Sequence, residues 1–340
     1  MNIRLKRLQG KIVSAELDGF VSFNPANIFY LAGFRAENSF IFVGKRAILA
    51  VPKLIYFSAK ESVCRGGCDL EILRNFEDFF KKNKNKKIGF ESSIPYQTLG
   101  KLRKIPGIKF KSFDRLIEDM RVIKDGREIS DIKTACEISK EAIRFTGKII
   151  KTGMSEKELA DKLEYFLREN GAEKSAFDII VASGKNSANP HHKPANRKFR
   201  KDDIVLVDLG CVYRGYSSDL TRTYFLSKID KCNKKVFDIA QEAQLKAINI
   251  IKDGVSCKKV DSAARNFIDE NGFGKNYIHS TGHGVGIDIH EEPVLSAKSE
   301  AILRQGMVVT VEPGIYIPGK FGVRVEDTVL VTKNGCEVLT

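Results

Sequence analysis

The stretch IVLVDLGCVYRGYSSDLTRTYF, residues 204–225, decides how the second half of this chain folds. It opens with an apolar run, Ile204–Leu209, that is interrupted by one acid, Asp208. Such a run is typical of a buried strand. A chain reversal near Tyr213-Arg214-Gly215 follows, and a second strand, Ser217–Phe225, returns. We therefore expect an antiparallel hairpin whose buried carboxylate is costly unless it is paired or bound to a metal.

The returning strand carries a second acid, Asp219. The midpoint between positions 208 and 219 falls between residues 213 and 214, inside the expected chain reversal. In a symmetric hairpin Asp208 and Asp219 would then lie opposite each other, with Cβ atoms about 4.5–5.5 Å apart. The first hairpin is therefore expected to present two carboxylates on one face.

A second hairpin repeats this pattern near the C-terminus. The apolar strand Val308–Val311 leads directly into Glu312, and a turn at Pro318-Gly319-Lys320 is followed by a strand, Val323–Val331, that contains Glu326. Gly319 is the midpoint of positions 312 and 326, so Glu312 and Glu326 should also face each other. Like charges that oppose one another destabilise a sheet, so both pairs make sense if cations hold them together.

Histidine supplies the remaining donor. All five histidines lie between positions 191 and 290, and this clustering favours one site. His283 stands out because it lies within Gly282-His283-Gly284-Val285-Gly286, where glycines permit close approach or unusual backbone angles. Carboxylates with one imidazole suit a pair of ions such as Mn²⁺, Co²⁺ or Zn²⁺. The expected metal ligands are Asp208, Asp219, His283, Glu312 and Glu326.

The flanking sequence predicts an α+β architecture in two domains. A long amphipathic helix is expected between Gly126 and Gly153, and a second between Ser155 and Asn170-Gly171. Further helices are expected at 233–251 and 256–271, wrapped on a curved, mainly antiparallel sheet. The first third alternates strands and helices, which indicates a smaller α/β domain. We place the N-terminal domain at residues 1–122 and the second domain, which carries the expected metal ligands, at 123–340.

Composition narrows the functional classes. The net charge is +14, but it is diffuse, and the one dense run, Lys81–Lys87, is expected to be a solvated loop. Since no helix-turn-helix, zinc-finger or RNA-binding signature occurs, we expect no nucleic-acid partner. The seven cysteines are scattered, which fits reduced thiols in a cytoplasmic protein. No run of eighteen apolar residues occurs, so neither a signal peptide nor a membrane partner is expected.

Several segments together closely resemble the pita-bread metallopeptidases, and within them the Xaa-Pro peptidases, prolidase and aminopeptidase P. The resemblance covers the whole second domain in order and extends more weakly to the first. The segments that carry it are SGKNSANPHH, VDLGCVYRGYSSDLTRT, HSTGHGVGIDIHEEP, VEPGIYIPG and GVRVEDT, with DGFVSFNPANIFYLAGF in the first domain.

The resemblance implies a hydrolase that cuts the Xaa-Pro bond with two divalent ions, Mn²⁺ before Co²⁺ or Zn²⁺. Asp208 would bind one ion, Asp219 and Glu326 both, and His283 and Glu312 the other. A hydroxide between the ions would attack the scissile carbonyl, and Glu312 would pass a proton to the leaving nitrogen. The resemblance also implies further roles: catalysis for His191 and His290, and substrate contact for His279, Tyr316 and Arg324.

Alternatives stay open at this point. A methionine aminopeptidase of the same fold usually lacks a separate N-terminal domain, and a non-catalytic binding module would be expected to lose metal ligands. Between a dipeptidase and an aminopeptidase that acts on longer peptides, we favour the dipeptidase. The substrate would then be a peptide with proline at its second position, and the enzyme is expected to be a homodimer. His192 departs from the family pattern and is expected to be a surface loop residue.

Overall fold

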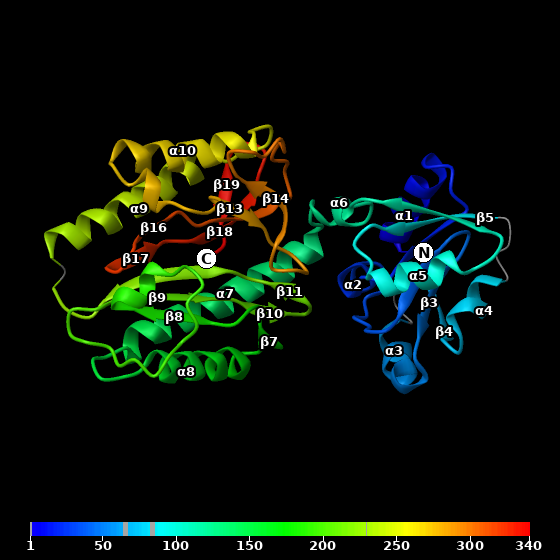
Figure 1. Ribbon diagram of the computed structural model, residues 1–340, viewed down its shortest axis with the longest axis horizontal. Coiled ribbons are helices and arrows are strands. Elements are labelled where there is room, and N and C mark those ends of the chain that lie inside the picture. Colours follow the sequence, from blue (N-terminus) through cyan, green and yellow to red (C-terminus); the bar gives the residue numbers. More distant parts are fainter. Residues whose placement is uncertain (1, 64–66, 82–85, 229) are drawn as a thin grey trace. The chain divides into compact units, whose positions relative to one another are not determined.

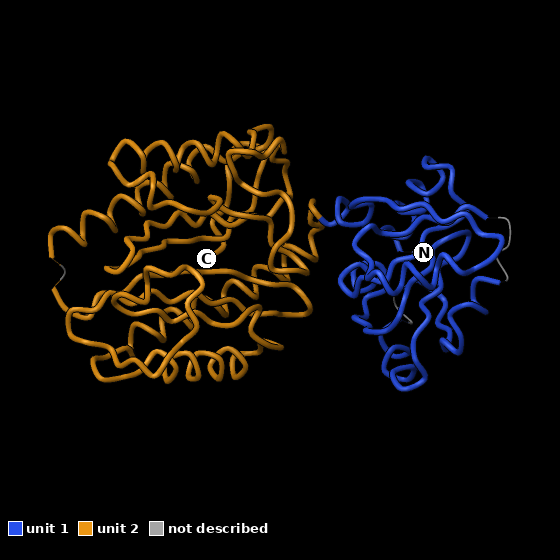
Figure 2. Tube along the Cα trace, viewed as in Figure 1, with its two compact units in different colours: residues 1–121 blue, residues 122–340 orange. Residues whose placement is uncertain are grey.

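The computed structural model describes residues 2–63, 67–81, 86–228 and 230–340. The chain forms two compact units, residues 1–121 and 122–340 (Figure 2). Cys64 and most of the expected basic loop, residues 82–85, lie outside the described residues. No helix within the described ranges is both long and apolar enough to cross a bilayer.

Unit 1 is a mixed sheet with helices on it (Figure 1). Its strands follow the order β4-β3-β2-β1-β5-β6, and phenylalanines such as Phe40, Phe80 and Phe90 fill its core. Its helices are α1 (Ile3–Ser14), α2 (Pro25–Ala32), α3 (Tyr56–Val63), α4 (Phe76–Lys81), α5 (Tyr96–Arg103) and α6 (Glu118–Arg121), with a short 3-10 turn, η1 (Lys53–Ile55). Its strands are β1 (Gly19–Ser22), β2 (Phe40–Val43), β3 (Ala47–Val51), β4 (Asp69–Ile72), β5 (Lys86–Glu91) and β6 (Ile108–Phe113).

The expected hairpin of Phe40–Val43 with Ala47–Val51 is confirmed, whereas helix α1 was not anticipated. The signal for α1 was present, since Asn2 caps it and Leu5, Leu8 and Ile12 share its buried face. The positive charge is less diffuse than expected. In residues 1–121, Lys and Arg number 23 against 12 Asp and Glu, so most of the net charge lies in unit 1.

Unit 2 contains the long helices in the expected places. Their ends follow capping rules, because Asp125 and Glu128 form a capping box on α7, and Ser155 caps α8. The helices are α7 (Gly126–Ile149), α8 (Glu156–Glu169), α9 (Lys231–Ile250) and α10 (Cys257–Glu270), with 3-10 turns η2 (Gly184–Ala188) and η3 (Gly274–Asn276).

The strands of unit 2 pair antiparallel throughout the described ladders, in several short sheets. In the first half they are β7 (Lys174–Ser175), β8 (Ile180–Ser183), β9 (Ile204–Leu209), β10 (Cys211–Tyr213), β11 (Tyr216–Ser217) and β12 (Leu220–Phe225). In the second half they are β13 (Gly282–Gly284), β14 (Glu291–Leu295), β15 (Val308–Val311), β16 (Gly314–Ile317), β17 (Phe321–Arg324), β18 (Asp327–Val331) and β19 (Cys336–Val338).

Unit 2 is layered, with strands between two pairs of helices (Figure 1). Helices α7 and α8 pack on the first-half strands, and their contacts form one apolar core that includes Leu163 and Val207. Helices α9 and α10 pack on the second-half strands around another core that includes Ala243 and Val309. The expected α+β arrangement of a curved antiparallel sheet with flanking helices, preceded by a smaller α/β unit, is confirmed.

The two hairpins differ in how well their registers were anticipated. In the first, Asp208 pairs with Thr221 rather than Asp219, because the tight turn lies at Arg214-Gly215, both with positive φ. The expected opposition of Asp208 and Asp219 is therefore wrong by two positions. In the second hairpin, Val311 pairs with Asp327 and Gly314 with Arg324, a register that puts position 312 opposite 326 as expected.

Candidate metal centre

Three carboxylates from the two hairpins converge inside unit 2. Asp208, Asp219 and Glu326 each offer an oxygen, and these atoms all lie within 4.8 Å of one another. A shift of two positions keeps a side chain on the same face of a strand, so Asp219 remains a diagonal neighbour of Asp208 despite the register correction. Gly210 makes this possible, because a Cβ there would lie 2.0 Å from the carbonyl oxygen of Ser218.

His283 and Glu312 adjoin this group from the second hairpin's side. The Nε2 atom of His283 lies 3.6 Å from Oδ2 of Asp219 and 3.3 Å from Oε1 of Glu312. The other ring nitrogen, Nδ1, lies 3.0 Å from the carbonyl oxygen of Gly284. Since a carbonyl oxygen only accepts hydrogen bonds, Nδ1 carries the proton of the neutral ring. Nε2 is then unprotonated, and its lone pair can bind a metal.

The donor set fits divalent cations. Asp208 Oδ1 and Glu326 Oε1 are buried and have no hydrogen-bond partner among the described residues. Burial and neighbouring carboxylates raise the pKa of Asp219 and of Glu326 well above the ordinary range, and burial also raises the pKa of Glu312. Burial lowers the pKa of His283, which favours the neutral ligand form. Cations would relieve this crowding of acids.

Polar groups behind the carboxylates fix their positions. Thr221 donates from Oγ1 to Oε2 of Glu326 at 2.6 Å, and Arg324 donates from Nε to the same hydroxyl at 3.1 Å. Arg324 Nη2 also donates to Asp208 Oδ2 at 2.5 Å. The hydroxyl of Thr310 accepts a hydrogen bond from the backbone N–H of His283 and donates one to Oε1 of Glu312 at 3.3 Å. Neither threonine was anticipated, although Thr310 is the one polar residue in the apolar strand 308–311.

The expected substrate-contacting residues form one buried chain of hydrogen bonds. Arg324 Nη1 donates to the Tyr316 hydroxyl at 2.7 Å, and Nε2 of His279 lies 3.0 Å from that hydroxyl. Arg324 and Tyr316 are only 3% and 2% exposed. Because Tyr316 accepts from Arg324, its own proton points to His279, which must accept it at Nε2. Burial lowers the pKa of His279 and so favours that neutral form.

The remaining histidines divide into two kinds. His191 and His290 are exposed, and the His290 ring packs at 4.4 Å from the His283 ring between centroids. Burial lowers the pKa of His290, and the charges of His283 and His191 lower this pKa further. These three histidines are therefore close enough to interact electrostatically with one another. His192 instead lies 2.7 Å from Glu156, whose side chain is fully buried. His192 therefore lies in a loop as expected, but its side chain is partly buried and paired with Glu156 rather than solvated at the surface.

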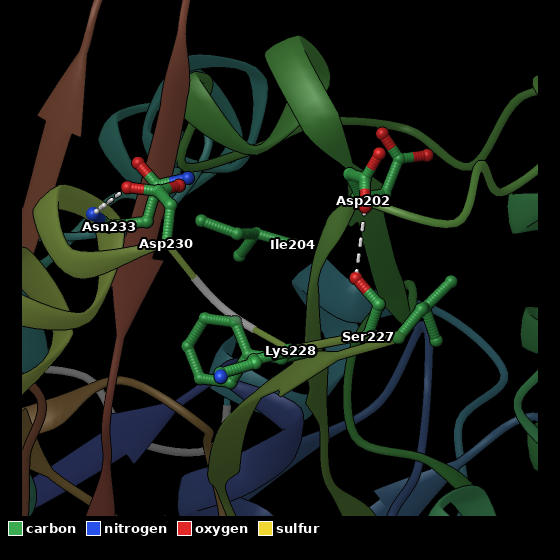
Figure 3. A pocket seen from close by; sticks show the side chains of 9 residues that line it. Asp202, Ile204, Ser227, Lys228, Asp230 and Asn233 are labelled. Atoms are coloured by element: carbon green, nitrogen blue, oxygen red, sulfur yellow. Dashed lines mark hydrogen bonds between the residues drawn. The ribbon is translucent and has the colours of Figure 1, made fainter.

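A separate cavity of about 260 Å³ lies at the other end of the first hairpin, where Ile204 pairs with Phe225 (Figure 3). Two of the acids that line it, Asp202 and Asp230, accept hydrogen bonds from neighbouring residues of the chain. Asp202 accepts from Ser227 at 3.0 Å, and Asp230 accepts the backbone N–H of Asn233 to cap α9. Asp208 lies four positions along the strand from Ile204, a distance of about 13 Å. The cavity is thus distinct from the metal centre.

Helix-flanked antiparallel hairpins that gather carboxylates and one imidazole at a buried site define the pita-bread class of metal-dependent hydrolases. The chain belongs to metallopeptidase family M24, whose model matches residues 130–333, and residues 4–123 match the Creatinase/Prolidase N-terminal domain. The family resemblance seen in the sequence is confirmed. The protein is a metal-dependent peptidase, and the alternative of a non-catalytic binding module is set aside.

Similarity to known proteins extends over the full chain. This chain is 41% identical to an Xaa-Pro dipeptidase of Pyrococcus horikoshii, and the match covers 100% of this chain and 97% of that protein. The solved structure of a prolidase from Pyrococcus horikoshii has a TM-score of 0.95 at 40% identity, covering 100% of this chain and 98% of that one. An X-Pro aminopeptidase structure from Thermotoga maritima has a TM-score of 0.92 at 36% identity, covering 100% and 98%.

Proposed function

We propose that this metallopeptidase is an Xaa-Pro dipeptidase, which hydrolyses the bond before proline in dipeptides. The observation that carries the hydrolytic part is the convergence of five side chains with metal-binding atoms at one buried site. Within the described part of the chain, one oxygen each of Asp208 and Glu326 has no hydrogen-bond partner. The preference for proline rests on full-length similarity to a protein described as an Xaa-Pro dipeptidase.

We assign two divalent ions to the site, with Mn²⁺ preferred over Co²⁺ or Zn²⁺. Asp208 would hold one ion, and His283 and Glu312 the other. Asp219 lies near both groups and would bind both ions with Glu326, which fits its position within 4.8 Å of Asp208 and 3.6 Å of His283. Bound ions supply an acidified water and polarise the peptide carbonyl at neutral pH.

The chain's own residues then handle protons and orientation. Glu312 is the group we assign to carry a proton to the leaving proline nitrogen, because its carboxylate adjoins the ligand cluster and retains 16% side-chain exposure. His191 and His290 are exposed beside the cluster and would donate hydrogen bonds to the developing oxyanion. His279, Tyr316 and Arg324 would form the ordered wall against which the substrate rests.

A second candidate is an aminopeptidase that removes the first residue from longer peptides beginning Xaa-Pro. The observation in its favour is the full-length likeness to the X-Pro aminopeptidase of Thermotoga maritima. Both candidates use the same bond and the same ligands. They differ in whether the site accepts residues after proline, so substrate length is the property to measure.

The proposal also covers assembly and surroundings. We propose domains at residues 1–122 and 123–340, a homodimer, and a reducing, cytoplasmic environment without nucleic-acid partners. Each of the six cysteines in the described ranges is a free thiol, which fits that environment.

The deciding experiment is a side-by-side assay of purified protein with Ala-Pro, Ala-Pro-Ala and Met-Ala-Ser, each with Mn²⁺, Co²⁺ and Zn²⁺. We expect cleavage of Ala-Pro, fastest with Mn²⁺, and little cleavage of the other two. Equal rates on Ala-Pro-Ala and Ala-Pro would favour the aminopeptidase, and cleavage of Met-Ala-Ser alone would overturn both candidates. Metal analysis after Mn²⁺ loading should return about two ions per chain, as a dinuclear site requires.

A further inference from the structure

Helix α10 carries an ion pair between Asp261 and Arg265. Arg265 also donates hydrogen bonds to the loop that precedes His283. Asp261 and Arg265, one helical turn apart, are joined by two hydrogen bonds, Nε to Oδ2 at 2.8 Å and Nη2 to Oδ1 at 2.9 Å. Asp261 is fully buried. Because a guanidinium has five N–H donors in a fixed fork, Arg265 can bond further groups while it holds the carboxylate.

The further groups are backbone carbonyls of the loop that follows η3. Arg265 Nη1 donates to the carbonyl oxygen of Tyr277 at 3.2 Å, and Nη2 donates to that of His279 at 2.8 Å. The guanidinium also lies over the Tyr277 ring, 4.3 Å from its centroid. One side chain therefore fixes both ends of a three-residue segment that presents His279.

Thr281 closes the network. Its hydroxyl donates to Oδ1 of Asp261 at 2.8 Å, and it lies 2.6 Å from the Tyr277 hydroxyl. A hydroxyl has one proton, so Thr281 must accept the bond from Tyr277. All three of these side chains are nearly or fully buried, at 0% for Asp261 and Thr281 and 3% for Tyr277. The directions of the hydrogen bonds are thus fixed throughout.

The backbone of Thr281 connects this network to two proposed metal ligands. Its carbonyl oxygen accepts the backbone N–H of Glu312 at 2.8 Å, and His283 follows two residues later. Through His279 the same loop also reaches Tyr316, Arg324 and then Asp208. A displacement of the loop would move the donor atoms of His283 and Glu312 together.

We propose that Arg265, held by Asp261, is a positioning residue for the metal centre, and that it sets the place of His279, His283 and Glu312 from behind. This rests on the proposed function only for its effect on turnover; the effect on cation binding is independent of substrate. Lysine cannot replace Arg265, since a single ammonium cannot bond the carboxylate in a fork and two carbonyls at once.

The test compares Arg265→Lys, Arg265→Ala and Thr281→Val with wild type. Lys234→Ala is the matched control, because Lys234 forms an i,i+4 pair with Asp238 on α9 that is exposed. Metal-free proteins are titrated with Co²⁺ alone and followed by visible absorption, which reports ligand geometry. Outer-shell partners of metal ligands typically contribute about 10–100-fold to affinity or activity, so we expect Co²⁺ binding weakened by about that factor, an altered absorption spectrum, and a similar fall in kcat on Ala-Pro.

The outcomes separate a positioning role from a purely structural one. A lowered melting temperature with unchanged Co²⁺ affinity, spectrum and kcat in Arg265→Lys would overturn the inference. If Arg265→Ala fails to fold, Arg265→Lys and Thr281→Val still decide it. If wild type cleaves none of the peptides but the variants lose Co²⁺ affinity, the proposed function fails and the positioning role stands. If wild type cleaves Ala-Pro and the variants match it in every readout, the reverse holds.

Discussion

The hydroxyl of Thr221 donates to Glu326 across 2.6 Å, and this bond joins the first hairpin of unit 2 to the second. The backbone reinforces it, because the N–H of Glu326 donates to the carbonyl oxygen of Thr221 at 3.2 Å. Glu326 Oε2 thus has a fixed donor, while Oε1 has no hydrogen-bond partner among the residues that the structure describes and is available to a cation. The carboxylate is oriented before any ion arrives.

Thr221→Val should therefore harm both stability and metal binding. Loss of the donor leaves a buried carboxylate oxygen unsatisfied, a change that costs about 1–3 kcal/mol. Thermal unfolding and Mn²⁺ titration measure the two effects. Thr221→Ser keeps the hydroxyl and should stay close to wild type. Full Mn²⁺ affinity in the valine variant would contradict the role of this bond.

Asp219→Asn should have opposite effects on activity and on metal-free stability. We expect turnover to fall by more than about 100-fold, since even outer partners of metal ligands contribute 10–100-fold. In EDTA at pH 8, removal of one of several crowded carboxylates should raise the melting temperature, because burial and neighbouring acids raise the pKa of Asp219 and so penalise its charged form. Wild-type turnover, or a lower melting temperature in EDTA, would refute the assignment.

Glu91 in unit 1 should make stability fall as pH rises. Burial raises the pKa of Glu91 to about 7, against the effect of backbone donors from Phe23 and Asn24. Its pKa is thus higher in the folded than in the unfolded chain, so the folded state binds the extra proton and loses stability between about pH 4.5 and 7. Glu91→Gln imitates the protonated form and should be more stable at pH 8, by on the order of 3 kcal/mol.

Denaturant unfolding at pH 5 and pH 8 measures the Glu91 effect, with Mn²⁺ present so that the acids of unit 2 contribute little. Glu71→Gln, at an exposed position on β4, is the control and should show no comparable change. If wild type and Glu91→Gln have the same pH dependence, Glu91 does not titrate in this range.

Alanine substitutions at the adjacent residues His191 and His192 should affect different properties, the first turnover and the second stability. His191→Ala should lower kcat by about 10²–10³-fold, as loss of an oxyanion donor does, with an unchanged melting temperature. His192→Ala should lower the melting temperature, because it removes a bond to the buried carboxylate of Glu156 that is worth about 1.5–3 kcal/mol. Steady-state kinetics and thermal unfolding of both variants test this, and an exchange of the two phenotypes would reverse the assignments.

Local pattern predicted much of unit 2. The capped helices and the apolar strands ending in acids follow from side-chain periodicity, and the second hairpin's register follows from a turn centred on Gly319. The first register failed because Arg214 adopts a positive φ, a conformation uncommon outside glycine that the pattern alone did not indicate. That failure left the site intact, since a two-residue shift preserves the face.

Long-range partners could not be predicted in the same way. The bond between Thr221 and Glu326 spans 105 positions, and the pair of His192 with Glu156 spans 36. No periodicity relates such residues, so the sequence pattern indicates neither the contact of Thr221 with Glu326 nor the pairing of His192 with Glu156. The sequence pattern also predicts continuous strands at 217–225 and 323–331, whereas in the structure each is interrupted at an acid, Asp219 or Glu326, that lies outside the strand pairing.

The two apolar cores of unit 2 give the metal centre a further meaning. Asp208 lies in β9 and Asp219 directly precedes β12, among the strands packed on α7 and α8. His283 lies in β13, and Glu312 and Glu326 lie just after β15 and just before β18, among the strands packed on α9 and α10. Neither group of strands carries the complete set of proposed ligands, so a bound cation would link the two groups. Cation occupancy would therefore depend on the two groups of strands being packed together. Removal of metal should increase amide hydrogen exchange where the two groups meet before it increases exchange in either apolar core.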